Sequence, residues 1–171
     1  MPVRILGIDP GLQLTGFAVV DVPDSPASPR LVEAGVIRLR PRDSLADRLH
    51  ELDRDLADLL ARTSPALACV ESLYAHYRHP TTAIAMGHAR GVILLAVRRC
   101  SVPLAEFRPN AIKKFLTGNG HASKEQMQRS VQALLGLAEP PSPPDVADAI
   151  AIALCAAHRC APARPCSMTA R

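Results

Sequence analysis

The chain has 171 residues, of which 48% are hydrophobic and 21% are charged. This length suits one domain with a sizeable core, and the composition excludes a disordered or fibrous protein. No run of 18 or more apolar residues occurs, and no signal-like segment precedes the first predicted strand. We therefore expect a cytoplasmic protein with no membrane partner. The five cysteines, an odd number, argue against a disulfide framework.

The net charge of +4 is unevenly distributed along the chain. Between Pro41 and Arg62, six acids outnumber four arginines. Between Leu73 and Val131, nine lysines and arginines outnumber two glutamates. A polyanion such as nucleic acid would be attracted to a surface of this kind. Solvated helix faces would produce the same count.

Three β-rich runs open the chain: Ile5–Asp9, Thr15–Val22 and Arg30–Leu39. A Pro-Gly turn joins the first two, which predicts adjacent antiparallel strands, and the third completes a three-stranded meander. Asp9 is the last residue of the first strand. Because an unpaired buried charge is unfavourable, a carboxylate at this position indicates contact with a cation or a substrate.

Leucines at steps of three and four predict an amphipathic helix from Leu45 to Leu60. Its acidic side chains should keep it away from a phosphate backbone. The apolar run Leu67–Glu71 predicts a fourth strand, which again ends in a carboxylate. The following helix, Thr81–Arg99, contains small residues that core packing or a subunit interface would explain.

A fifth strand is predicted over Val102–Phe107, followed by a basic helix around Lys113 and Lys114. Ser123 is the expected N-cap of the next helix, because Gln126 stands three residues later in a capping-box arrangement.

The proline-rich segment Pro140–Pro144 is expected to stop the preceding helix and introduce the last one. That last helix carries Asp145 and Asp148, which lie on one face because they are three residues apart. We expect one domain over residues 1–158 and a disordered tail over 159–171.

Four carboxylates converge if the acid-ending strands are neighbours and the last helix packs across them. Such a cluster requires counter-charge, and oxygen ligands favour Mg²⁺ or Mn²⁺. Two such ions per site could activate a water and stabilise the leaving oxygen of a phosphodiester. Taken singly, Asp145 and Asp148 could instead complement the helix dipole, and Glu71 could be a surface acid.

Several motifs together resemble the RuvC family of Holliday-junction resolvases, over nearly all residues from Ile5 to His158. The motifs are Leu6–Gly11 with Thr15-Gly16, Val70–Tyr74, Gly87–Gly91, Lys113-Lys114, Gly118–Gly120 with Lys124, and Asp145–Ala149. The resemblance implies an α/β, ribonuclease-H-like fold with a five-stranded mixed sheet flanked by helices. It also implies a homodimeric, metal-dependent endodeoxyribonuclease that resolves four-way DNA junctions by paired nicks in recombination and repair. The family works with the RuvA-RuvB branch-migration complex.

Residue by residue, the resemblance implies roles for the four acids and for part of the basic stretch. The family's metal-binding and catalytic positions fall on Asp9, Glu71, Asp145 and Asp148. Its DNA-contacting positions fall on Tyr74, Lys113 and Lys124.

The residues after Glu71 also indicate DNA binding by their own chemistry. Tyr74, Tyr77 and Arg78 combine stacking surface with positive charge. A core position for Tyr74 is the alternative. This segment departs from the family pattern: it is one residue longer, Tyr77 to His79 replace a usual Lys-Asn pair, and His88 replaces a frequent glutamine.

Two other classes of protein share the first motif or the fold. An actin-like or sugar-kinase-like ATPase also opens with Gly-Ile-Asp-x-Gly, but it needs a duplicated domain and a second phosphate loop, which 171 residues do not accommodate. A silent nucleic-acid-binding relative, or a ribonuclease of the same fold, is the third class. The four retained acids argue against silence, and the basic stretch does not separate DNA from RNA.

Overall fold

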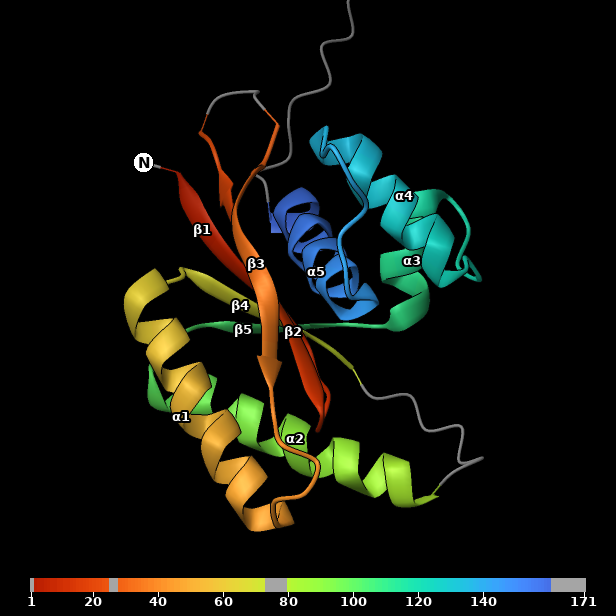
Figure 1. Cartoon of the computed structure of the whole chain (residues 1–171). Helices are drawn as coiled ribbons and strands as arrows, with labels where there is room; N and C mark the ends of the chain where they lie inside the picture. Colours follow the sequence, from red (N-terminus) through yellow and green to blue (C-terminus); the bar gives the residue numbers. More distant parts are fainter. Residues whose placement is uncertain (1, 25–27, 73–79, 161–171) are drawn as a thin grey trace, which may run out of the picture.

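The structure, a computed structural model, describes residues 2–24, 28–72 and 80–160. In this part of the chain, a five-stranded mixed sheet lies between two layers of helices (Figure 1). The strands are β1 (Val3–Asp9), β2 (Leu14–Val22), β3 (Arg30–Arg38), β4 (Leu67–Glu71) and β5 (Leu104–Phe107). The helices are α1 (Leu45–Thr63), α2 (Pro80–Arg99), α3 (Pro109–Thr117), α4 (Lys124–Leu135) and α5 (Pro144–Cys160).

The sheet has the strand order β3-β2-β1-β4-β5. The first three strands form the predicted antiparallel meander, and β4 and β5 add to β1 as parallel strands. Parallel neighbours end at the same edge of a sheet. The carboxyl ends of β1, β4 and β5 therefore lie together, which brings residues from distant parts of the sequence to one edge.

Each face of the sheet has its own core. On one face, Leu52 and Leu56 of α1 and Ile93 of α2 pack with Leu6 and Ile8 of β1. The other face is covered by α5, with α3 and α4 outside it (Figure 1). Because strand side chains alternate between faces, residues 5, 7 and 9 of β1 point toward α5.

Two glycines allow α5 to lie directly on the sheet. A Cβ added at Gly7 would lie 2.3 Å from the carbonyl oxygen of Ala149. A Cβ added at Gly16 would lie 2.1 Å from the carbonyl oxygen of Asp145. Gly16 is the register partner of Asp9, so this close approach carries the first turn of α5 to the end of β1.

The fifth strand is shorter than the predicted Val102–Phe107 and begins at Leu104. Ser101 adopts a left-handed conformation (φ 58°), and the Val102 N–H donates to the Val97 carbonyl oxygen at 3.2 Å. Val102 therefore closes the end of α2 instead of pairing with β4.

The helix boundaries follow local capping. Ser123 caps α4 as predicted: the Gln126 N–H donates to Ser123 Oγ at 3.3 Å, and the Ser123 N–H donates to Gln126 Oε1 at 2.8 Å. The expectation that the proline segment stops this helix is wrong, because Gly136 (φ 62°) already ends it at Leu135.

The last helix, α5, continues to Cys160, two residues beyond the predicted domain boundary. Residues 161–171 lie outside the described residues. None of the helices in the described part of the chain is long and apolar enough to span a membrane.

Candidate active site

The sheet and α5 bring the four predicted acids to one place. Asp9 ends β1 and Glu71 ends β4, and these parallel strands are paired up to Ile8 and Val70, the residues just before the acids. Both acids point toward α5 by the alternation of strand side chains. The first turns of α5 supply Asp145 and Asp148. The structure therefore brings the four carboxylates together, as expected if the acid-ending strands are neighbours.

The four acids line one cleft of about 550 Å³. Its walls are formed by the turn after β1, by α2 and by the helices α3 and α4. The remaining lining residues are Pro10, Gly11, Leu12, Gln13, Leu14, Thr82, Met86, Pro109, Ile112, Lys113, Lys124 and Met127. Acids and lysines thus share a cleft that is otherwise largely apolar, which strengthens their mutual electrostatic interactions.

Asp9 is the most perturbed of these acids. Burial, followed by repulsion from Asp148, Glu71 and Asp145, raises its pKa from 3.8 to about 8, while Lys124 acts in the opposite direction. A carboxylate in this environment binds a proton, or an equivalent positive charge, much more strongly than a carboxylate in water.

Glu71 and Asp148 respond in the same way. Burial and the charge of Asp148 raise the pKa of Glu71 to about 7, against the lowering effect of Lys113 and Lys124. Burial also raises the pKa of Asp148, and Lys124 is the main group opposing this increase. The cleft therefore contains more negative charge than its two lysines neutralise.

The donor set of the cleft suits a hard divalent cation. Carboxylate oxygens are the ligands that Mg²⁺, Mn²⁺ and Ca²⁺ prefer. Among residues 2–24, 28–72 and 80–160, no three acids, histidines or cysteines are already arranged around one point as the ligands of a single ion. The acids interact electrostatically across the cleft instead, and bound cations would offset the burial and repulsion that raise the pKa values of Asp9 and Glu71.

Two of the five predicted DNA-contacting residues border the cleft. Lys113 lies on α3, and Lys124 is the first residue of α4, just after its Ser123 N-cap. Both lower the pKa of Glu71, so their positive charge acts on the acids. The other three residues, Tyr74, Tyr77 and Arg78, lie outside the described residues.

Sequence reasoning did not assign a role to Arg90, although it lies in one of the family motifs. Its Nε donates to the carbonyl oxygen of Glu71 at 3.4 Å, and its guanidinium forms an ion pair with Glu106 of β5. The backbone N–H of Ser72 also donates to the Phe107 carbonyl oxygen at 2.9 Å. These contacts hold the end of β4, and with it Glu71, at the edge of the sheet.

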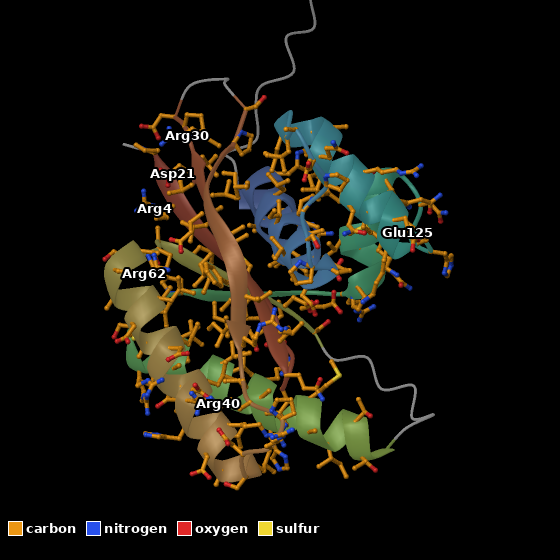
Figure 2. All side chains as sticks on the ribbon, in the orientation of Figure 1. Arg4, Asp21, Arg30, Arg40, Arg62 and Glu125 are labelled. Atoms are coloured by element: carbon orange, nitrogen blue, oxygen red, sulfur yellow. The ribbon has the colours of Figure 1, made fainter. Side chains whose placement is uncertain are left out.

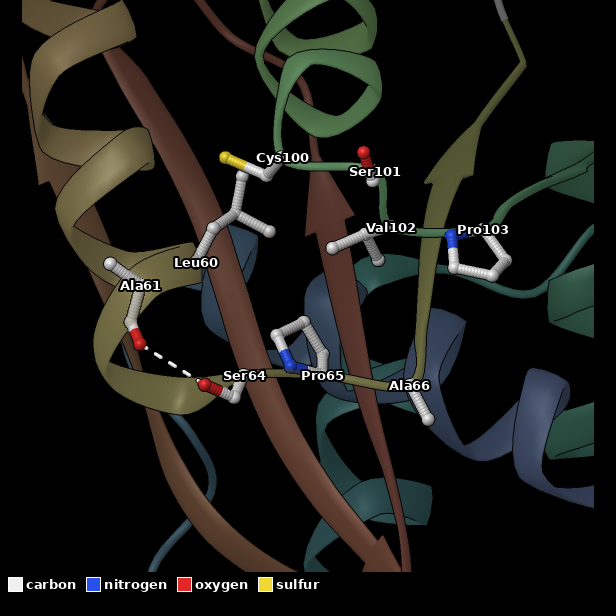
Figure 3. Close-up of a pocket in the computed structure, with 9 residues that line it drawn as sticks. All are labelled: Leu60, Ala61, Ser64, Pro65, Ala66, Cys100, Ser101, Val102 and Pro103. Carbon is white, nitrogen blue, oxygen red and sulfur yellow. Dashed lines mark hydrogen bonds between the residues drawn. The ribbon is translucent and has the colours of Figure 1, made fainter.

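A second pocket, of about 360 Å³, lies at the opposite end of the parallel strands (Figure 3). It is formed by the end of α1 and the connections that lead into β4 and β5. Its lining residues are Leu60, Ala61, Ser64, Pro65, Ala66, Cys100, Ser101, Val102 and Pro103. None of these is a carboxylate or a cation, so this pocket offers none of the chemistry of the acidic cleft.

Comparison with known proteins gives one consistent family. The family model described as crossover junction endodeoxyribonuclease RuvC matches residues 5–156. Crossover junction endodeoxyribonuclease RuvC of Rhodopirellula baltica is 49% identical over 153 residues, which cover 88% of this chain and 84% of that protein.

Solved structures give the same result. Thermus thermophilus RuvC in complex with Holliday junction substrate has a TM-score of 0.84 at 33% identity, covering 93% of this chain and 95% of that chain. The yeast mitochondrial Holliday junction resolvase Ydc2 has a TM-score of 0.65 at 13% identity, covering 91% and 79%, a likeness of fold alone. The fold is the expected ribonuclease-H-like one. The chain belongs to the RuvC family of crossover junction endodeoxyribonucleases.

Proposed function

We propose that this chain resolves four-way (Holliday) DNA junctions by paired symmetric nicks, as part of recombination and DNA repair. The observation that carries the proposal is the single cleft in which four carboxylates meet two lysines, in a chain that belongs to this nuclease family. A phosphodiester needs neutralisation of negative charge to react, and the cleft combines sites for cations with fixed positive charges.

We further propose that Asp9, Glu71, Asp145 and Asp148 hold two divalent ions, Mg²⁺ or Mn²⁺. Nucleases of this family depend on metal ions. When bound, two such ions lower the pKa of the attacking water and stabilise charge on the leaving oxygen of an in-line displacement. The raised pKa values of Asp9 and Glu71 support this assignment, because burial and mutual repulsion in the cleft favour added positive charge.

The other residues of the cleft bind and orient the DNA strand. A phosphate approaching four carboxylates is repelled, and Lys113 and Lys124 offset that repulsion from the α3 and α4 side. Contacts to phosphates position a backbone without reading its sequence. Tyr74, Tyr77 and Arg78 remain predicted DNA contacts, with stacking on unpaired bases as the proposed role of the tyrosines.

Symmetric nicking requires two active sites on one junction, so we propose a homodimer with α2 at its interface. Ile84 and Leu95 on α2 are 61% and 55% exposed, although both are large apolar residues. A Cβ added at Gly87 or Gly91 would have no neighbour within 4 Å. This face of α2 is therefore apolar and open, as a helix that packs against a second copy would be.

Two further expectations rest on the family resemblance. A branch-migration complex of the RuvA-RuvB kind would deliver the junction, and the protein would work in the cytoplasm. Both remain predictions.

The proposed function is tested with purified protein and three labelled substrates: a four-way DNA junction, a linear DNA duplex of the same sequence and an RNA duplex. With Mg²⁺ or Mn²⁺, we expect symmetric nicks in the junction and none in the linear substrates. A chelator should stop the reaction. Equal cleavage of junction and linear DNA would contradict structure selectivity, and preferential RNA cleavage would favour the ribonuclease alternative.

A further inference from the structure

Three arginines follow one another at alternate positions where β3 ends: Arg38, Arg40 and Arg42, here called the arginine turn. All three are exposed. Arg38 pairs in register with Leu14 of β2, and the Leu39 N–H donates to the Gln13 carbonyl oxygen at 3.0 Å. Because Gln13 and Leu14 line the acidic cleft, the arginine turn begins at the rim of that cleft.

The register also shows which face of the sheet Arg38 occupies. Gly16 and Val36 form the next in-phase pair along the two strands, and Gly16 is the residue that the Asp145 backbone covers. Residues two apart on a strand share a face, and so do register partners. Arg38 therefore lies on the face of the sheet that α5 covers. It is two residues along β3 from Val36, the register partner of Gly16.

The next two arginines stand on a tight turn. The Asp43 N–H donates to the Arg40 carbonyl oxygen at 3.1 Å, which closes a four-residue turn with Pro41 at its second position. Proline fixes φ at this position and favours such turns. Arg40 and Arg42 therefore flank the proline on a turn with restricted backbone freedom, which reduces the entropy cost of binding a ligand.

The positive charge of this turn is available to a ligand. Within the described residues, no side chain of the arginine turn makes an ion pair or hydrogen bond. Two acids of the neighbouring helix α1 are already paired: Asp53 with Arg99 at 2.7 Å and Asp55 with Arg54 at 3.0 Å. Asp43, in the turn itself, forms no ion pair with these arginines in the part of the chain that the structure describes. The first acid along α1, Asp47, accepts a hydrogen bond from Ser44 Oγ at 2.6 Å and donates its backbone N–H to the same oxygen at 3.1 Å.

The expectation that the helix from Leu45 to Leu60 lies away from a phosphate backbone concerns α1, whereas the arginine turn precedes that helix. Of the three arginines, only Arg42 belongs to the acidic stretch from Pro41 to Arg62, so counting charge along the sequence does not separate the turn from the helix that follows it. Figure 2 shows Arg40 and Arg30 at opposite ends of β3. At the Arg30 end, Arg4 forms an ion pair with Asp21. Arg4, at the far end of the sheet, is thus paired with an acid, whereas Arg38, Arg40 and Arg42 make no ion pair among the described residues.

We propose that the arginine turn binds the phosphate backbone of a junction arm. With Lys113 and Lys124 on the α3 and α4 side, the acidic cleft is then bordered by cations on two sides. Guanidinium groups suit this role because they bind phosphate oxygens through two parallel hydrogen bonds. The inference rests on the proposed function and adds a second DNA-contacting surface to it.

The test measures binding of a labelled four-way junction by fluorescence anisotropy, without divalent ions, over a range of salt concentrations. The variants are Arg38→Gln and the double variant R40Q/R42Q. Arg54→Gln is the matched control. Like the three arginines of the turn, Arg54 is exposed, but it lies on α1 and is paired with Asp55. Thermal unfolding of each variant shows that the fold is retained.

We expect the double variant to bind roughly 10-fold more weakly at about 100 mM salt, and Arg38→Gln roughly 3-fold more weakly. The slope of log affinity against log salt should become shallower by roughly 0.9 for each phosphate that the variant no longer neutralises. Arg54→Gln should match the wild type in both respects.

Unchanged affinity and slope in folded variants would overturn the proposal. Weaker binding with an unchanged salt slope would also overturn it, since the weakening would not come from phosphate binding. The wild-type protein shows whether the arginine-turn proposal alone has failed or the proposed function as well. If wild type binds and nicks the junction while the variants behave identically to it, only the arginine turn is refuted.

Discussion

Replacing Asp9 with asparagine is expected to stabilise the metal-free protein while abolishing cleavage. Burial and three neighbouring carboxylates raise the pKa of Asp9 from 3.8 to about 8. The folded protein therefore holds this proton more tightly than the unfolded chain does. The resulting contribution to stability is present below pH 4 and is lost as the pH rises toward 8. Asparagine has a similar shape and no charge, so it avoids this loss.

The size of the expected stabilisation follows from the increase in the pKa of Asp9. One pKa unit corresponds to about 1.36 kcal/mol, so a shift of about four units gives an upper bound of about 5 kcal/mol near neutral pH. Glu71 and Asp148 still repel each other in the variant, which retains part of the unfavourable energy. We expect a gain of about 2 to 4 kcal/mol in the free energy of unfolding. For a protein of this size, that raises the melting temperature by about 5 to 15 °C.

The assay is urea or thermal unfolding of wild type and Asp9→Asn between about pH 5 and pH 8.5, with a chelator present. The wild type should lose stability over this range, and the variant should lose less. Asp58→Asn, at an exposed acid of α1, is the matched control and should follow the wild type. Adding Mg²⁺ should stabilise the wild type more than Asp9→Asn. A variant no more stable than wild type at pH 8 would refute the reasoning that the acids are crowded and short of counter-charge.

Three further predictions concern the site, the fold and the dimer. Asp148→Asn should abolish cleavage yet keep junction binding within a few-fold of wild type; normal cleavage would remove Asp148 from the metal site. Gly7→Ala should lower the free energy of unfolding by about 3 kcal/mol or more in urea, because the new Cβ would lie 2.3 Å from the Ala149 carbonyl oxygen. A near-neutral effect would mean that α5 shifts easily. Leu95→Glu should sediment as a monomer and lose paired nicking, since it buries a charge at the proposed α2 interface; an unchanged dimer would place the interface elsewhere.

The sequence by itself determined the local features. The alternation of apolar residues located the strands, and the run Leu67–Glu71 was predicted at its observed bounds. The Ser123 capping box predicted where α4 begins. Acids at strand ends could be recognised because both strands are short apolar runs that finish on a carboxylate. Such features depend on neighbours within a few residues, which is why one sequence suffices to find them.

Local signals also had limits within single elements. The run Val102–Phe107 has the composition of a strand, yet its first residue completes the end of α2 instead. The segment Pro41–Arg62 is acidic by count, although Arg42 near its start makes no ion pair among the described residues. The end of the preceding helix decided the first outcome, and the pairing of other charges decided the second.

Only the tertiary structure decided that the four acids share one cleft. Parallel pairing of β1 with β4 joins residues more than 60 positions apart, and no local pattern specifies that pairing. The crossing of α5 over Gly7 and Gly16 then brings Asp145 to the end of β1. The raised pKa of Asp9 arises from this packing, because burial and repulsion depend on distance in space rather than along the chain.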